Sequence, residues 1–239
     1  MAEEEMTEEL WFNCNSPDAM LQELQERWRM HRTKSGRRRH RLFATACCRQ
    51  IPGFATEPVP FALIEAVESY ADGAISKAEM QIARDSYPCR EFTGIIREDF
   101  DPILRRRILS AHPREEFARQ AFAAMAWERP SSCVDCNHDA AAAIEGENMF
   151  VERRRQTKYL RDIFGNPFRP VPLDPRWLTS TVVDLVQAIY DERAFDRMPI
   201  LADALMDAGC DSDEIILHCR GDGPHVSGCW VVDLLLGKT

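Results

Sequence analysis

The sequence predicts an all-α fold. Apolar residues recur at helical spacing along most of the chain, capping residues precede several of these runs, and no two strong strand-like runs are present that would pair. With 239 residues, 45% of them apolar, the chain is long enough to form one large domain or two small ones, each with its own core.

Capping signals locate the helices of the first part. Ser16-Pro17-Asp18 combines an N-cap with a proline at the first helical position, and Ser76–Glu79 forms a capping box. Gly73 is suited to end the helix that precedes this box. The predicted helices cover 17–28, 36–50, 61–72, a segment starting at 76, 113–126 and 139–164.

A proline-rich segment marks the boundary to the second part. From Asn166 to Pro175 there are four prolines and no helical periodicity. We therefore expect a helical N-terminal region at 1–158 and a compact helical C-terminal module at 159–239. The predicted elements of the module are helices at 181–195, 200–208 and 211–219, and a run at 230–236 that is compatible with a helix or a strand.

Composition narrows the classes of function. The net charge of −9 argues against a general nucleic-acid binder, and no apolar run is long enough to span a membrane. The acidic start lacks the features of a signal peptide, so we expect a cytoplasmic protein whose nine cysteines stay reduced. The sequence also lacks a nucleophile elbow, a phosphate-binding loop and a dinucleotide-binding glycine pattern.

A group of cysteine and histidine residues near the C-terminus has two interpretations. Cys210, Cys219, His225 and Cys229 provide four donors for a closed, structural zinc site, with His218 as the alternative to Cys219. The other interpretation, which we favour, is that these cysteines are small buried residues of the core, because the group contains no Cys-x2-Cys pair. A structural zinc ion is the single cofactor that the sequence suggests.

Two further cysteine motifs have weaker interpretations. Cys133-x2-Cys136-x-His138 is compatible with a metal site, a redox dithiol or an ordinary loop, and the strand pattern of a thioredoxin fold is missing around it. Cys47 and Cys48 are neighbours in a predicted helix, so we expect one to face the core and the other to lie at its boundary.

Charged residues suggest two more sites. The segment 27–41 contains eight cations and no acid, and it is a candidate contact for nucleic acid or an acidic protein surface. Its candidate contact residues are Arg32, Lys34, Arg37, Arg38, Arg39 and Arg41. Asp233 lies in an apolar run, and His225 with Asp233 is the one acid–base pair that a hydrolytic enzyme would use.

Several segments together resemble an uncharacterised family expanded in planctomycete bacteria. The most specific are Leu160–Pro170, Ala188–Arg193 and Gly223–Trp230, and the first part of the family is similar to Leu42–Arg49 and Tyr70–Gly73. The resemblance implies a two-part layout and no particular activity.

These observations favour a non-enzymatic, cytoplasmic interaction or adaptor module with an unknown protein partner. The alternative is a zinc-stabilised module that binds nucleic acid through residues 27–41. An enzyme is the least favoured of the three hypotheses, because no catalytic set of residues accompanies His225 and Asp233.

Overall fold

The computed structural model confirms the predicted all-α fold for the part of the chain that it describes. It describes residues 5–51, 58–87, 114–126, 136, 139–141, 143–144 and 149–238, and none of these residues lies in a strand. The chain divides into an N-terminal unit, Met1–Thr157, and a C-terminal unit, Lys158–Thr239. The expected division was between residues 158 and 159, and the proline-rich segment at 166–175 lies inside the C-terminal unit.

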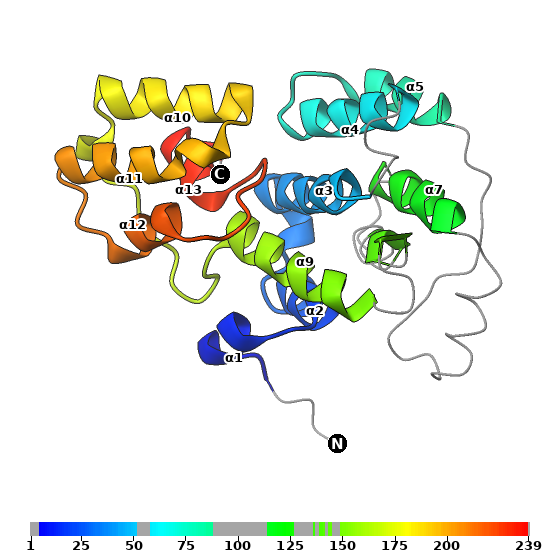
Figure 1. Cartoon of the computed structure of the whole chain (residues 1–239), viewed down its shortest axis with the longest axis horizontal. Helices are drawn as coiled ribbons and strands as arrows, with labels where there is room; N and C mark the ends of the chain where they lie inside the picture. The colour runs from blue at the N-terminus through cyan, green and yellow to red at the C-terminus, as the bar shows by residue number, and fades with distance from the viewer. Residues whose placement is uncertain are drawn as a thin grey trace. The chain divides into compact units, whose positions relative to one another are not determined.

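The N-terminal unit is built around one helix that is buried on nearly all sides. Its described helices are α1 (Glu8–Asn13), α2 (Pro17–Glu26), the short 3-10 helix η1 (Met30–Arg32), α3 (Lys34–Arg49), α4 (Pro58–Ala71), α5 (Lys77–Asp85), α7 (Arg114–Met125) and the first part of α9 (Met149–Phe164) (Figure 1). Helix α3 packs against both α4 and α7.

The second half of α3 explains why this helix is central. Every residue from Leu42 to Cys48 is buried, and Phe43 is completely enclosed. Beyond them, Arg49 forms ion pairs with Glu65 and Glu68 of α4, at 2.6 and 2.8 Å. Cys47 and Cys48 are both fully buried, so the expectation that only one of them faces the core is wrong: at this point α3 has helices on more than one side.

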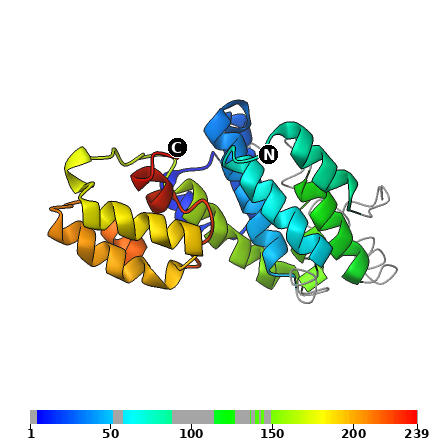
Figure 2. The same cartoon turned by 90° about the horizontal axis from the view of Figure 1, so that it is seen from above.

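The C-terminal unit contains the end of α9 followed by a small group of helices. These are η3 (Pro175–Trp177), α10 (Ser180–Glu192), η4 (Phe195–Arg197), α11 (Met198–Asp207), α12 (Asp213–Arg220) and α13 (Trp230–Leu235). Helix α11 packs against both α10 and α12 (Figure 1). Figure 2 also shows α10, in yellow, beside α11, in orange. The apolar run at 230–236, which the sequence left open between helix and strand, forms helix α13, Trp230–Leu235.

Local signals set the ends of these helices. The side chain of Thr179 accepts a hydrogen bond from Val182 N at the start of α10, and Ser212 does the same for Ile215 N at the start of α12. The apolar faces between these ends form one core, which includes Trp177, Val186, Ile189, Leu201, Leu205, Cys210, Ile215, Cys219, Cys229 and Val232.

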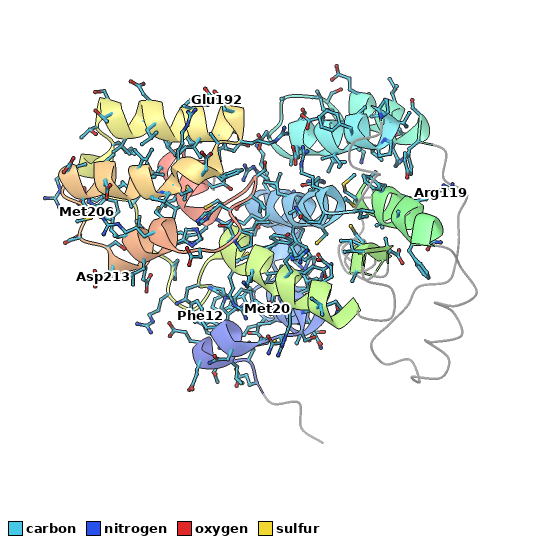
Figure 3. The ribbon with its side chains drawn as sticks, viewed as in Figure 1. Phe12, Met20, Arg119, Glu192, Met206 and Asp213 are labelled. Atoms are coloured by element: carbon cyan, nitrogen blue, oxygen red, sulfur yellow. The ribbon has the colours of Figure 1, made fainter. Side chains whose placement is uncertain are left out.

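The outside of the C-terminal unit carries charged side chains and several apolar ones. In Figure 3, Glu192 of α10, Met206 of α11 and Asp213 of α12 are labelled on its outer surface, and all three are exposed. Among the helices that the structure describes, none has the length and apolar character needed to cross a membrane.

Candidate metal centre

Four donor side chains converge inside the C-terminal unit. They are Asp162 in the last turn of α9, His218 in the last turn of α12, His225 in the following loop, and Cys229 at the N-cap of α13. One donor atom from each residue lies within 4.8 Å of all the others. Asp162 and Cys229 are buried, and the two histidines are partly buried.

The loop between α12 and α13 explains why three donors come from such a short segment. Gly221, Gly223 and Pro224 end α12 and turn the chain back, so that His225 returns to the side of His218. The backbone N–H of Cys229 then donates to the carbonyl of Val226, at 2.9 Å, and this turn delivers Cys229 to the start of α13. The two imidazole rings pack edge to face, with their centroids 4.8 Å apart.

The distances between donor atoms are close to those of a tetrahedral zinc site. Asp162 Oδ1 lies 2.8 Å from His225 Nδ1 and 3.1 Å from His218 Nε2. Cys229 Sγ lies 3.1 Å from His218 Nε2 and 3.9 Å from His225 Nδ1. Zinc bonds of the usual length place neighbouring donors roughly 3.3–3.8 Å apart, so small side-chain movements would complete the coordination.

The carboxylate of Asp162 is held in a defined orientation. Its second oxygen, Oδ2, accepts a hydrogen bond from the backbone N–H of Val226, at 2.9 Å. This contact leaves Oδ1 to face the two histidines and Cys229. A carboxylate fixed in this way offers one oxygen to a metal ion, which is the arrangement that a four-coordinate site requires.

The protonation states of the site change when a cation binds. Burial alone would raise the pKa of Asp162, but the hydrogen bonds from His218 and His225 outweigh it and hold this pKa below its ordinary value. Burial, with a smaller contribution from the charge of Asp162, raises the pKa of Cys229 well above its ordinary value. Without metal, Cys229 is therefore a thiol, and a bound cation would displace its proton.

The geometry differs from that of a catalytic relay. In a nucleophile–histidine–acid relay, the nucleophile and the acid contact opposite nitrogens of the imidazole ring. Here Nε2 of His218 faces both Asp162 and Cys229, and Nδ1 of His225 also faces both. Cys229 is also completely buried, so a substrate has no path to its sulfur in this arrangement.

The structure places the five residues of the predicted cysteine–histidine group in two environments. His225 and Cys229 are in the four-donor group, together with His218, the residue considered as the alternative to Cys219. Cys210 and Cys219 belong to the apolar core, as the packing interpretation expects. Burial raises the pKa of Cys219 to about 12, so this side chain stays a neutral thiol.

The sequence did not single out Asp162 as a donor. It lies 63 positions before His225, and nothing in the spacing connects the two. One signal was present in the sequence. Asp162 lies among apolar residues in the last turn of a helix, where the helix dipole disfavours a negative charge. Its neighbours Leu160, Ile163 and Phe164 are buried in the structure.

The proposed acid–base pair has a different arrangement in the structure. The carboxylate that contacts His225 is that of Asp162, and Asp233 is not a member of the four-donor group. Asp233 is completely buried in α13. Arg220, at the end of α12, forms an ion pair with the exposed Asp203 of α11, at 2.6 Å.

Of the Cys-x2-Cys motif, Cys133 and His138 lie outside the described residues. Cys136 is fully buried, and its sulfur lies 3.6 Å from that of Cys48 and 3.6 Å from the carbonyl oxygen of Ala44 in α3. Cys136 therefore packs as a core residue of the N-terminal unit.

The basic segment is only partly available to a partner. Arg38 is buried and forms an ion pair with Asp72, at 2.9 Å, and the guanidinium of Arg41 lies over the ring of Tyr70, at 4.8 Å. Arg39 is half-buried. The exposed members of the six candidate contact residues are Arg32, Lys34 and Arg37.

Comparisons of the chain with protein-family models, with curated proteins and with solved structures found no match.

Proposed function

We propose that the C-terminal unit is a zinc-stabilised helical module, and that the protein acts by binding a protein partner rather than by catalysis. The observation that carries the metal proposal is the convergence of four donor atoms from Asp162, His218, His225 and Cys229, all within 4.8 Å of one another. In each histidine a single ring nitrogen faces both Asp162 and Cys229, and this arrangement supports a coordination site over a catalytic relay.

The chemistry of the donor set favours zinc. A thiolate and two imidazoles suit a borderline-soft cation, and a hard, octahedral ion such as magnesium is held by oxygen ligands instead. One thiolate and one carboxylate also balance the two charges of Zn²⁺, so the complete site is neutral. Neutrality matters because Asp162 and Cys229 are buried, where an uncompensated charge would be costly.

The site is expected to be structural. Four protein ligands fill a tetrahedral zinc ion and leave no position for water or substrate. The donors come from α9, α12, the loop after α12 and the start of α13, so the ion would hold the end of one helix against the last two. Metal binding of this kind contributes directly to the free energy of folding.

A surface of acidic and apolar residues supports a role in protein binding. On α11 and α12, the side chains of Ile200, Met206 and Leu217 are 57%, 48% and 70% exposed. Exposed acids lie on the same two helices: Asp203, Asp207, Asp213 and Glu214. A surface of this composition suits a partner segment that is both basic and apolar.

Metal analysis of the purified full-length protein tests the metal proposal. We expect one zinc ion per chain, and we expect the metal-free protein to take up Co²⁺ with the near-ultraviolet absorption of a thiolate–cobalt bond. The variant Cys229→Ser should lose this absorption and most of the zinc affinity, because it removes the single thiolate ligand.

Cys219→Ser is the matched control, because Cys219 is as deeply buried as Cys229 and lies one residue after His218. It should lower the stability of the unit and leave the cobalt absorption unchanged. Wild-type protein that binds neither zinc nor cobalt, or equal metal binding by Cys229→Ser and wild type, would overturn the metal proposal.

The interaction proposal has its own test. The substitution Leu217→Lys, at the most exposed apolar side chain of the C-terminal unit, should abolish the capture of the partner from a lysate of the source organism. Val183→Lys, at the exposed Val183 of α10, is the control and should retain the partner. Equal capture by both variants would exclude this surface.

A further inference from the structure

The two histidines of the metal centre lack the hydrogen bonds that usually orient such ligands. A metal-bound histidine generally donates its other ring N–H to an acceptor, and this bond fixes the ring. Among the described residues, Nδ1 of His218 has no partner, and Nε2 of His225 is buried without one. Asp162, by contrast, is held by the N–H of Val226. The contacts of the His218 ring with its aromatic neighbours are therefore the candidates for orienting its imidazole.

Trp230 is in the position to do so. Its indole packs against the imidazole of His218, with the ring centroids 5.2 Å apart and the planes inclined by 58°. His225 contacts the same imidazole, at 4.8 Å and 72°. Trp230 directly follows the ligand Cys229 in the chain, so the segment that delivers the sulfur also delivers the indole.

The indole itself is seated on the backbone of Gly165. This glycine, which follows the last residue of α9, has φ +64°, and a Cβ atom at this position would lie 3.1 Å from Cγ of Trp230. Glycine is therefore required twice: for the left-handed conformation and for the close approach of the ring. Gly165 lies three residues after Asp162. The residue that contacts the indole is therefore close in the chain to another donor of the site.

From these contacts we propose that Trp230, resting on Gly165, is the positioning residue that orients His218 toward the metal ion. The inference rests on the proposed zinc site and adds to it the residue that sets its affinity and geometry. The alternative is that Trp230 only fills space in the core, as buried aromatic residues commonly do. The two roles differ in one respect: a positioning residue changes the affinity and coordination geometry of the metal ion, whereas a packing residue changes the stability of the unit.

The test compares metal binding by full-length wild type, Trp230→Phe and Trp230→Leu. We measure zinc affinity by competition with a chelator and record the visible absorption of the Co²⁺ form, which reports coordination geometry. Loss of the ring in Trp230→Leu should weaken zinc binding by about 10–100-fold and change the cobalt spectrum, as for other groups that orient a metal ligand. Trp230→Phe keeps an aromatic face and should restore most of the affinity.

Two controls separate positioning from general stability. Trp177→Leu removes a buried tryptophan of the core against which the partly buried Trp230 packs, and it should lower stability with the cobalt spectrum unchanged. In a His218→Ala background, Trp230→Leu should cause no further loss of affinity, because its effect passes through the missing ring. Gly165→Ala, which crowds the indole, should shift the cobalt spectrum even if Trp230→Leu does not fold.

The possible results distinguish the two proposals. Wild-type protein that binds no metal would overturn both of them. If wild type binds zinc, and the folded Trp230 and Gly165 variants match its affinity and cobalt spectrum, the zinc site stands and the positioning role of Trp230 is overturned.

Discussion

At the scale of single residues, Cys219 and Cys229 are equally buried but have different neighbours. Burial raises the pKa of both thiols, so desolvation does not separate a ligand from a packing residue. Only Cys229 has two imidazole nitrogens and a carboxylate within reach of its sulfur. Successive side chains of a helix point about 100° apart, so His218 and Cys219 cannot both face the site, and here His218 does.

This contrast also shows what the sequence could predict about the site. From spacing alone, the candidate ligands were Cys210, Cys219, His225 and Cys229, with His218 as the alternative to Cys219, and packing in the core was the favoured interpretation. Three of the donors that converge in the structure, His218, His225 and Cys229, were among these candidates. The fourth donor could not be predicted, because Asp162 joins the group through the packing of α9, far away along the chain. The choice between His218 and Cys219 depended on the rotation of α12, which spacing alone does not fix.

Asp162 is expected to be necessary for metal binding. In Asp162→Asn the amide oxygen can still accept the hydrogen bond from Val226, but the negative charge that balances the cation is lost. We predict that zinc binding weakens at least about 100-fold, more than for a group that only orients a ligand. Asp203→Asn, at an exposed acid of the same unit, is the control. Unchanged zinc affinity in Asp162→Asn would remove this residue from the site.

His40 in the N-terminal unit should make stability depend on pH. Burial lowers its pKa from 6.5, and nearby His31 and Arg41 act in the same direction, against the hydrogen bond from Nδ1 to the Gly36 carbonyl at 2.7 Å. Because the unfolded chain takes up the proton first as the pH falls, the stabilising contribution is present above about pH 6.5 and decreases below it.

Urea unfolding followed by circular dichroism, at about pH 7.5 and about pH 5.5, measures this effect, which is limited to about 1.4 kcal/mol per pH unit. His40→Gln keeps a donor for the Gly36 carbonyl but cannot titrate. We predict that this variant loses less stability than wild type between the two pH values. An equal loss in both proteins would show that His40 does not titrate in this range.

At the scale of elements, capping residues predicted the helix starts better than apolar periodicity predicted the ends. The predicted N-caps Ser16 and Ser76 both precede helices in the structure. The run at 230–236 could not be assigned from the sequence, because a short apolar run suits a buried helix or strand equally well. Its helical state follows from contacts with α10 and α12, which are tertiary in origin.

The start of α3 gives a prediction in which the usual glycine rule is reversed. Replacing a helical glycine by alanine normally stabilises a helix by about 1 kcal/mol. At Gly36, however, an added Cβ would lie 1.9 Å from the carbonyl oxygen of Met30 and 2.8 Å from Oγ1 of Thr33. We predict that Gly36→Ala lowers the free energy of unfolding by about 2 kcal/mol or more.

Thermal and urea unfolding of the full-length protein measure this loss. Ser35→Ala, in the same turn, is the control and should change stability little. A Gly36→Ala variant as stable as wild type would show that η1 can move away from α3 without cost.

At the scale of the whole molecule, the chain divides into two units after Thr157, ahead of the proline-rich segment at 166–175 that suggested a two-part layout. Each unit has its own core, so each is expected to respond to its own perturbations.

Calorimetry of the full-length protein should therefore resolve a metal-sensitive and a metal-insensitive transition. We predict that a chelator lowers the melting temperature of one transition, which belongs to the C-terminal unit. Phe43→Ala, in the core of the N-terminal unit, should lower the other transition, with a loss of about 3–5 kcal/mol. A single transition that shifts in both experiments would mean that the units unfold together.

The long interval between Asp162 and His225 has a consequence for the denatured ensemble. An ion bound to both residues would join positions 63 apart, and an ion that stayed bound during unfolding would restrict the conformations open to the denatured chain. For a covalent cross-link, a loop of this length corresponds to about 4 kcal/mol of lost chain entropy. The cation would thus act as a reversible tether, formed without any oxidant and removable by a chelator.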